Sequence, residues 1–221
     1  MKTVFRGLLA LLLCLIGATS AWAETGITPS SIVIGQTGVF SGPVAEPALQ
    51  YRAGAQLYFD EVNAKGGISG RKIKLVSYDD KFDPKLAAEN TRKLIEEDKV
   101  FALFGYIGTG ATVASIPKIN EHRVPVIGAL SGADGLRDPK LNLIFHTHAS
   151  YGAETGKMVE QLTTTGVKSI AVVFQDDPFG KAGLKSVQGA FTKFNIKPTI
   201  EAPIDMGKLD ALAATTTEIA K

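Results

Sequence analysis

The sequence predicts an α/β protein in which parallel sheets are flanked by helices. Short apolar runs rich in β-branched residues alternate with amphipathic helical patterns from about residue 31 to the end of the chain. The composition is that of a globular protein, since 45% of the 221 residues are hydrophobic and 21% are charged. Repeated strand–helix units favour parallel sheets joined by right-handed crossovers.

The first 23 residues have the pattern of a secretory signal peptide. Lys2 and Arg6 precede an apolar run from Gly7 to Gly17, and Ala21-Trp22-Ala23 ends the segment with the small–x–small pattern of a cleavage site. The apolar run is shorter than the roughly 20 residues that a membrane-spanning helix needs. We therefore expect cleavage after Ala23 and export to the periplasm.

The expected mature chain is electrically balanced and contains no cysteine. Cleavage would remove Lys2 and Arg6 from the 24 basic residues and leave 22 basic and 22 acidic ones. This balance argues against nucleic acid and anionic membrane surfaces as partners. The single cysteine, Cys14, lies in the signal peptide, where it follows bulky leucines rather than the small residues typical of a lipidation site. We expect neither a disulfide nor a cysteine metal site.

The first series of elements begins with a strand over residues 31–36 and a helix whose apolar face includes Tyr51 and Val62. Gly66-Gly67 is typical of a helix end. A strand follows at 72–78, and Asp83-Pro84 then predicts the start of a helix that ends near Asp98.

The acidic turn that contains Asp79-Asp80 is interpreted as solvated charge beside the helix cap. The next elements are a strand over 100–104, a helix opened by Gly108-Thr109-Gly110, and a strand over 124–130. Pro117 is expected to bend that helix or cut it short.

A second series is expected as strands over 143–148, 169–174 and 199–204, with helices over 150–164, 181–194 and 209–221. Residues 131–142 interrupt the alternation and suggest a boundary between an N-terminal lobe at 24–140 and a C-terminal lobe at 141–221. Because the pattern stops on a helix with no closing strand, we expect this second lobe to be incomplete.

A binding site is expected where the first and third strands end, because ligands of open parallel sheets lie beyond the carboxyl ends of the strands. Gly108 and Gly110 would let the backbone approach a ligand. Thr109 and the free amides at the helix start would attract a carboxylate. A plain helix start with a threonine cap is the alternative.

Three further turns supply candidate ligand contacts. Ser131, Gly132 and Ala133 follow the fourth strand and suit the wall of a polar pocket, although a lobe linker explains them equally well. At the start of a later helix, one of Asp176 and Asp177 is expected to cap the helix, while the other faces the ligand together with Phe179. Tyr151 lies at a similar turn, where its ring could stack on a ligand.

Signals for an enzyme or a metal site are weak. The glycines of residues 105–110 have the order G-x-x-G-x-G, which differs from the dinucleotide-binding fingerprint. The chain also contains no P-loop, no G-x-S-x-G and no H-E-x-x-H motif. His146 and His148 could share a metal ion, but no third ligand is apparent, so we expect no metal and no cofactor. An exported hydrolase using Asp176 and His148 is the rival hypothesis.

Several stretches resemble the periplasmic Leu/Ile/Val-binding protein family, the solute receptors of branched-chain amino acid ABC transporters. They are residues 34–43, 54–71, 78–80 and 83–84, and the Asn-Ala-Lys-Gly-Gly run at 63–67 is the most specific. The resemblance covers about residues 32–194. It implies a two-lobe periplasmic-binding-protein type I fold that closes over its ligand.

Carried over by this resemblance, the ligand-binding hydroxyl falls on Thr109, the backbone contacts fall near 130–133 with Ser131 as the polar group, and the aromatic contact falls on Phe179. The acid that holds the ligand's ammonium group would lie beyond Lys221. The resemblance implies a monomeric receptor that captures an amino acid-like ligand for a membrane ABC permease and makes or breaks no bond. The alternatives are a receptor for another small carboxylate or amide, and a truncated remnant that does not bind.

Overall fold

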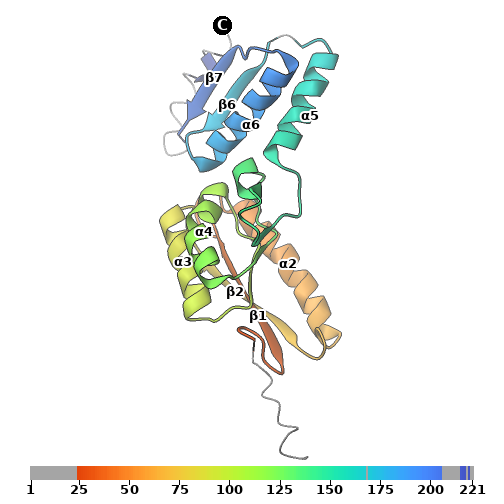
Figure 1. Cartoon of the computed structure of the whole chain (residues 1–221), viewed down its shortest axis with the longest axis vertical. Helices are drawn as coiled ribbons and strands as arrows, with labels where there is room; N and C mark the ends of the chain where they lie inside the picture. Colours follow the sequence, from red (N-terminus) through yellow and green to blue (C-terminus); the bar gives the residue numbers. More distant parts are fainter. Residues whose placement is uncertain (1–23, 168, 206–214, 218, 220–221) are drawn as a thin grey trace, which may run out of the picture.

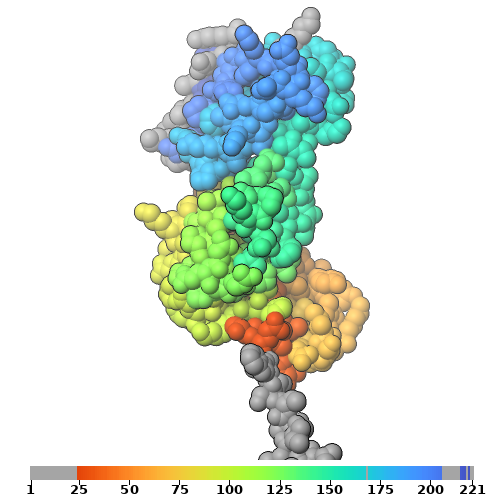
Figure 2. Space-filling view, viewed as in Figure 1, coloured from red at the N-terminus to blue at the C-terminus, as the bar shows by residue number. Residues whose placement is uncertain are grey.

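Two parallel sheets organise the chain, for which a computed structural model describes residues 24–167, 169–205, 215–217 and 219 (Figure 1). The expected signal peptide lies outside the described residues, as does most of the expected helix over 209–221. The space-filling view in Figure 2 shows the two parts of the molecule stacked along its long axis.

The larger sheet has five parallel strands in the order β2-β1-β3-β4-β5. The strands are β1 (Ser31–Gly38), β2 (Lys72–Asp79), β3 (Ala102–Phe104), β4 (Val126–Ile127) and β5 (Ile144–Phe145). Strand order reverses between β1 and β3, which confirms these two as the pair that flanks the switch point.

Helices cover both faces of this sheet, as parallel sheets require. Figure 1 shows α3 (Pro84–Glu96) and α4 (Thr109–His122) on one side and α2 (Glu46–Ala64) on the other. Leu94, Leu103 and Ile119 are fully buried between the sheet, α3 and α4. On the α2 side, Phe59 packs edge-on against Phe104 of β3. The strands are therefore held from both faces, and their carboxyl ends are fixed in place.

The predicted helix ends are confirmed, but Pro117 does not cut its helix short, which was one of the two effects expected of it. Asp83 caps α3 by accepting a hydrogen bond from the Lys85 amide at 2.7 Å, and Gly66 follows α2 with a φ of 102°. Helix α4 continues through Pro117 to His122. Proline removes the backbone hydrogen bond to the carbonyl four residues earlier, that of Val113, and this single loss does not end the helix.

The smaller sheet pairs β6 (Ala171–Gln175) with β7 (Ile200–Ile204) in parallel. Helices α5 (Tyr151–Thr164) and α6 (Pro178–Phe194) pack against each other beside it. Val159, Ala190 and Phe191 form the buried centre of this part.

The chain leaves the larger sheet later than the lobe boundary expected at residue 140, because that sheet includes the strand expected over 143–148. It is reduced to Ile144–Phe145 and pairs with β4 in the larger sheet, with Ile144 opposite Val126. The ladder ends there, and the rings of His146 and His148 bond to the carbonyls of Leu136 and Ala129. The chain therefore passes from one sheet to the other through residues 146–150, after β5, rather than at residue 140.

The acidic turn after β2 also differs from its interpretation as solvated charge. Asp80 is fully buried and accepts hydrogen bonds from the Thr37 hydroxyl and the Phe82 amide, both at 3.0 Å. These hydrogen bonds offset the cost of burying a carboxylate. The sequence pattern alone does not predict this burial, because it results from the packing of β1 against β2.

Candidate functional site

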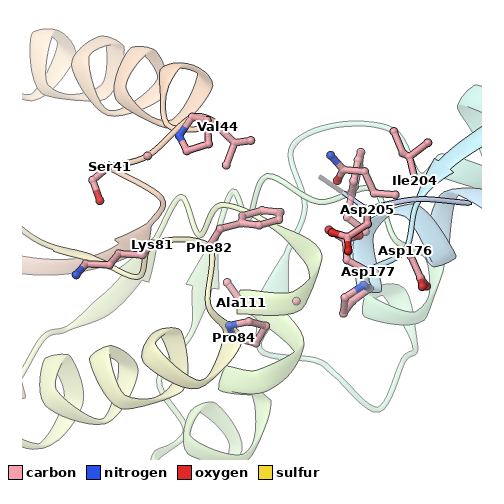
Figure 3. A pocket seen from close by; sticks show the side chains of 16 residues that line it. Ser41, Val44, Lys81, Phe82, Pro84, Ala111, Asp176, Asp177, Ile204 and Asp205 are labelled. Carbon is pink, nitrogen blue, oxygen red and sulfur yellow. The ribbon is translucent and has the colours of Figure 1, made fainter. Parts of the chain in front are cut away.

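A cleft of about 510 Å³ lies between the carboxyl end of the larger sheet and the start of α6. Figure 3 shows residues from both parts of the chain facing each other across it. The lining residues are Ser41, Gly42, Pro43, Val44, Lys81, Phe82, Pro84, Gly110, Ala111, Gln175, Asp176, Asp177, Pro178, Phe179, Ile204 and Asp205.

The turn between β1 and α2 forms one wall of the cleft. The Asp79 carboxylate holds it by accepting a hydrogen bond from the Phe40 amide at 2.9 Å and another from the Ser41 hydroxyl. Burial acts to raise the pKa of Asp79, but hydrogen bonds from Ser41, Lys81 and Phe40 together lower it. Asp79 thus fastens this turn to the neighbouring turn after β2.

Lys81 and Phe82 form that neighbouring turn in an unusual backbone conformation. Both lie in the left-handed region, with φ angles of 52° and 64°, which costs an L-residue about 1–2 kcal/mol. The Asp79 carboxylate accepts a hydrogen bond from the Lys81 amide at 2.9 Å, and the Asp80 carboxylate accepts one from the Phe82 amide at 3.0 Å. Burial raises the pKa of Asp80 to about 6, although its hydrogen bonds act in the opposite direction.

The start of α4 borders the cleft. Gly108 precedes the helix with a φ of 102°, which favours glycine, and Gly110 and Ala111 line the cleft. The first amides of a helix have no partner within it and carry partial positive charge. This end of α4 is therefore suited to an anionic group.

Residues of β6, α6 and β7 form the opposite wall. Asp177 caps α6 by accepting the Gly180 amide at 2.8 Å, as expected for one member of the Asp176-Asp177 pair. Asp176 lies 2.7 Å from Lys181 in an exposed ion pair. The exposed ring of Phe179 adds an apolar surface, next to Ile204 at the end of β7.

Three of the predicted ligand contacts, Gly110, Asp176 and Phe179, line the cleft. Thr109 and Ser131 do not, because both are buried and their hydroxyls bond to each other at 2.7 Å. Their side chains connect the start of α4 to the loop after β4. The cleft surface at the start of α4 is therefore formed by Gly110 and Ala111.

The remaining predicted contacts form a layer behind the cleft wall. The Tyr151 amide donates to the Gly132 carbonyl at 2.6 Å, and the Tyr151 ring meets the Phe179 ring edge-on at 5.8 Å between centroids. Ala133 is buried beside Leu136. Tyr151 therefore supports Phe179 from behind rather than lining the cleft itself.

Sequence reasoning missed Lys81, Phe82 and Pro84 as lining residues. The signal was present, because the β2 carboxyl end lies beside that of β1 in the predicted sheet and leads into this turn. Its acidic residues are typical of a solvated turn, so the sequence pattern does not identify this turn as a wall of the cleft.

The residues of the rival enzyme and metal hypotheses do not form a reactive pair. The two ring nitrogens of His148 lie 2.9 and 3.0 Å from the backbone carbonyls of Ala149 and Ala129, while Asp176 pairs with Lys181. Within the described ranges, no group of three potential metal ligands occurs. Among the described helices, none combines the length and apolar character needed to cross a bilayer.

Comparison with known proteins gives a family match over most of the chain. The sequence model of a family described as periplasmic binding protein matches residues 31–217. An amino acid binding protein of Pseudomonas aeruginosa is 27% identical over 97% of this chain and 57% of its own length. The Leu/Ile/Val-binding protein of Escherichia coli K12 is 28% identical over 93% of this chain and 54% of its own length. The chain thus spans about half the length of the curated relatives it matches.

A solved structure gives the same result. The substrate-binding periplasmic protein of Ralstonia solanacearum superposes with a TM-score of 0.79 at 32% identity, covering 86% of this chain and 54% of that protein.

Proposed function

The chain belongs to the periplasmic binding protein family, and on that premise we propose that it captures a small amino acid-like ligand, branched-chain or related, in the cleft between its two sheets. In this proposal the chain acts in the periplasm as a monomer, delivers its ligand to a membrane ABC importer, and makes or breaks no bond. The proposal rests foremost on one observation, that helix starts from both parts of the molecule line a single cleft.

The helix starts favour a ligand carboxylate. Gly110 and Ala111 belong to the first turn of α4, Val44 lies two residues before the start of α2, and Pro178 begins α6. The start of α4 carries partial positive charge and free amides, which attract anions, whereas α6 begins with a proline that has no N–H and its Gly180 amide is capped by Asp177. The α4 amides lie at the switch point of the larger sheet, so they are the proposed contact for the carboxylate.

The rest of the lining favours a ligand with an apolar body and accommodates a positive group. Apolar surface comes from Val44, Pro84 and Ile204. The carboxyl groups of Asp176 and Asp177 lie on the wall formed by β6, α6 and β7. These acids support an amino acid over a simple carboxylate, although Asp177 caps α6 and Asp176 is shared with Lys181. A receptor for a small carboxylate or amide without an ammonium group is the alternative.

Binding is proposed to draw the two walls together. A ligand that touches Gly110 on one wall and Phe179 on the other gains contacts in the closed form, and its affinity difference shifts the population toward closure. Residues 146–150 carry the chain from β5 to α5 and are the described segment about which the walls would move.

Isothermal titration calorimetry with leucine, isoleucine, valine, alanine and their deaminated carboxylates tests the proposal. We expect Ala111→Glu to abolish binding, because the new carboxylate would repel the ligand carboxylate at the start of α4. Since Ala111 is only 7% exposed, thermal unfolding would first verify that this variant is folded. Val113→Glu is the matched control, since it adds the same charge on an exposed position of the first turns of α4 outside the cleft. Absence of heat with every compound, or undiminished binding by Ala111→Glu, would contradict the proposal.

A further inference from the structure

We propose that Phe82 is a specificity-determining residue, which selects carboxylates with an aromatic ring over those with an aliphatic body of similar size. The inference rests on the proposed function, since it concerns the same cleft, and it narrows the branched-chain or related ligands of that proposal to related ones with an aromatic ring. Phe82 was not among the residues that the sequence or the family resemblance indicated.

The backbone at Phe82 is held in a conformation that a bulky side chain rarely adopts. Its φ of 64° follows the φ of 52° at Lys81, so two consecutive non-glycine residues are left-handed. Strain of this kind persists only where the surroundings enforce it, and it concentrates at ligand-contacting sites.

Buried polar groups enforce this conformation. The fully buried Asp80 carboxylate accepts the Phe82 amide and the Thr37 hydroxyl, and the Asn90 amide donates to that same hydroxyl at 3.1 Å. The Asp83 amide closes the turn on the Asp80 carbonyl at 2.8 Å. The polar network on one side of the turn thus leaves the Phe82 side chain directed to the other.

The Phe82 ring lies in the cleft beside the proposed carboxylate site. Its edge is 3.4 Å from the position that a Cβ on Gly108 would occupy, so the ring covers the residue that precedes α4. The side chain nevertheless remains 40% exposed. Figure 3 shows the ring projecting from its turn toward the wall that carries Ile204 and Asp205.

A second exposed phenyl ring lines the same cleft from the opposite wall. Phe179 is 42% exposed and is oriented by its edge-on contact with Tyr151. Aromatic rings attract one another in offset or edge-on geometries, with a gain beyond that of buried area alone. A ligand ring seated between Phe82 and Phe179 would meet one ring from each wall, while its carboxylate reached the α4 amides.

Calorimetric titration with two matched ligand pairs tests the inference. The pairs are L-phenylalanine with L-leucine, and phenylacetate with 4-methylpentanoate, so that each contrasts a ring with a branched aliphatic body. We expect the wild-type chain to prefer the ring in at least one pair by about tenfold. Phe82→Leu, which keeps apolar bulk without the ring, should bring that ratio close to one, and Phe82→Tyr should retain it.

Leu57→Ala is the control, because Leu57 is 75% exposed on α2 and does not line the cleft. It should leave the ratio unchanged, and thermal unfolding would verify that every variant is folded. A wild-type chain that binds the aliphatic members equally well or better, or an unchanged ratio in Phe82→Leu, overturns the role of Phe82 while leaving the proposed function intact. Absence of binding to all four compounds and to the amino acids tested above overturns both.

Discussion

At the scale of single residues, Asp80 shows how a buried carboxyl group shapes the cleft without entering it. It holds the Phe82 amide and the Thr37 hydroxyl, yet burial raises its pKa from 3.8 to about 6. A protonated Asp80 carboxyl can still accept the hydrogen bonds from the Thr37 hydroxyl and the Phe82 amide, so these two contacts do not require the charged form. Its ionisation therefore acts against the folded state.

This shift predicts a definite dependence of stability on pH. Between about pH 4 and pH 6 the folded protein retains a proton that the unfolded carboxyl has released, so stability falls as the pH rises through this window. The component from Asp80 should amount to about 1–3 kcal/mol. Urea unfolding of the wild-type chain at several pH values would show the decrease.

Asp80→Asn provides the comparison for this prediction. Asparagine cannot ionise, and its carbonyl oxygen can still accept the Phe82 amide. The decrease between pH 4 and pH 6 should therefore be smaller in Asp80→Asn than in the wild type. Equal slopes in the two proteins would show that Asp80 does not titrate as its burial indicates.

At the scale of elements, a buried hydroxyl pair joins the start of α4 to the loop after β4. Thr109 and Ser131 lie 2.7 Å apart, and the Ala133 amide also donates to the Ser131 hydroxyl at 3.3 Å. A ligand-binding hydroxyl was expected at Thr109, but this arrangement gives the side chain a structural role and leaves the neighbouring amides for a ligand.

A double-mutant cycle separates these roles. Ser131→Ala should lower the free energy of unfolding by about 1–2 kcal/mol, because it leaves the buried Thr109 hydroxyl without its partner. Thr109→Ala should lower it similarly, and the double variant should lose less than the sum of the two. Additive losses in urea unfolding would indicate that the two hydroxyls act independently.

At the scale of the whole molecule, Asp134 connects the two parts of the chain. It begins the short helix η1 (Asp134–Arg137) and accepts the Gly152 amide of α5 at 2.9 Å and the Ser186 hydroxyl of α6 at 2.8 Å. Burial acts to raise the pKa of Asp134, but hydrogen bonds from Ser150, Ser186 and Gly152 lower it, so the carboxylate form is favoured. One charged group thus spans the segment about which closure is proposed.

Removing this carboxylate should loosen the junction. We expect the Gly152 amide to exchange its hydrogen several-fold faster in Asp134→Ala than in the wild type, as measured by hydrogen–deuterium exchange. Asp138→Ala is the matched control, because Asp138 bonds to Lys140 within its own turn. Equal exchange in all three proteins would argue against Asp134 as a link between the two parts.

The sequence determined the local features of this protein. Alternating apolar runs and helical faces specified the order of strands and helices. Asp83-Pro84, the Asp176-Asp177 pair and Gly66 specified helix ends through capping and backbone conformation. These signals are readable because each acts within a few residues. The turn that opens α4 and the exposed Phe179 near the α6 cap, which both line the cleft, are local features of the same kind.

Only the tertiary structure decided which groups meet across long distances in the chain. It assigned Ile144–Phe145 to the larger sheet, buried Asp80 between turns, paired Thr109 with Ser131, and brought Phe82 opposite Phe179 in one cleft. The physical reason is that burial and side-chain direction depend on packing between elements. Identical short patterns of polar and apolar residues are compatible with either a solvated turn or an enclosed one.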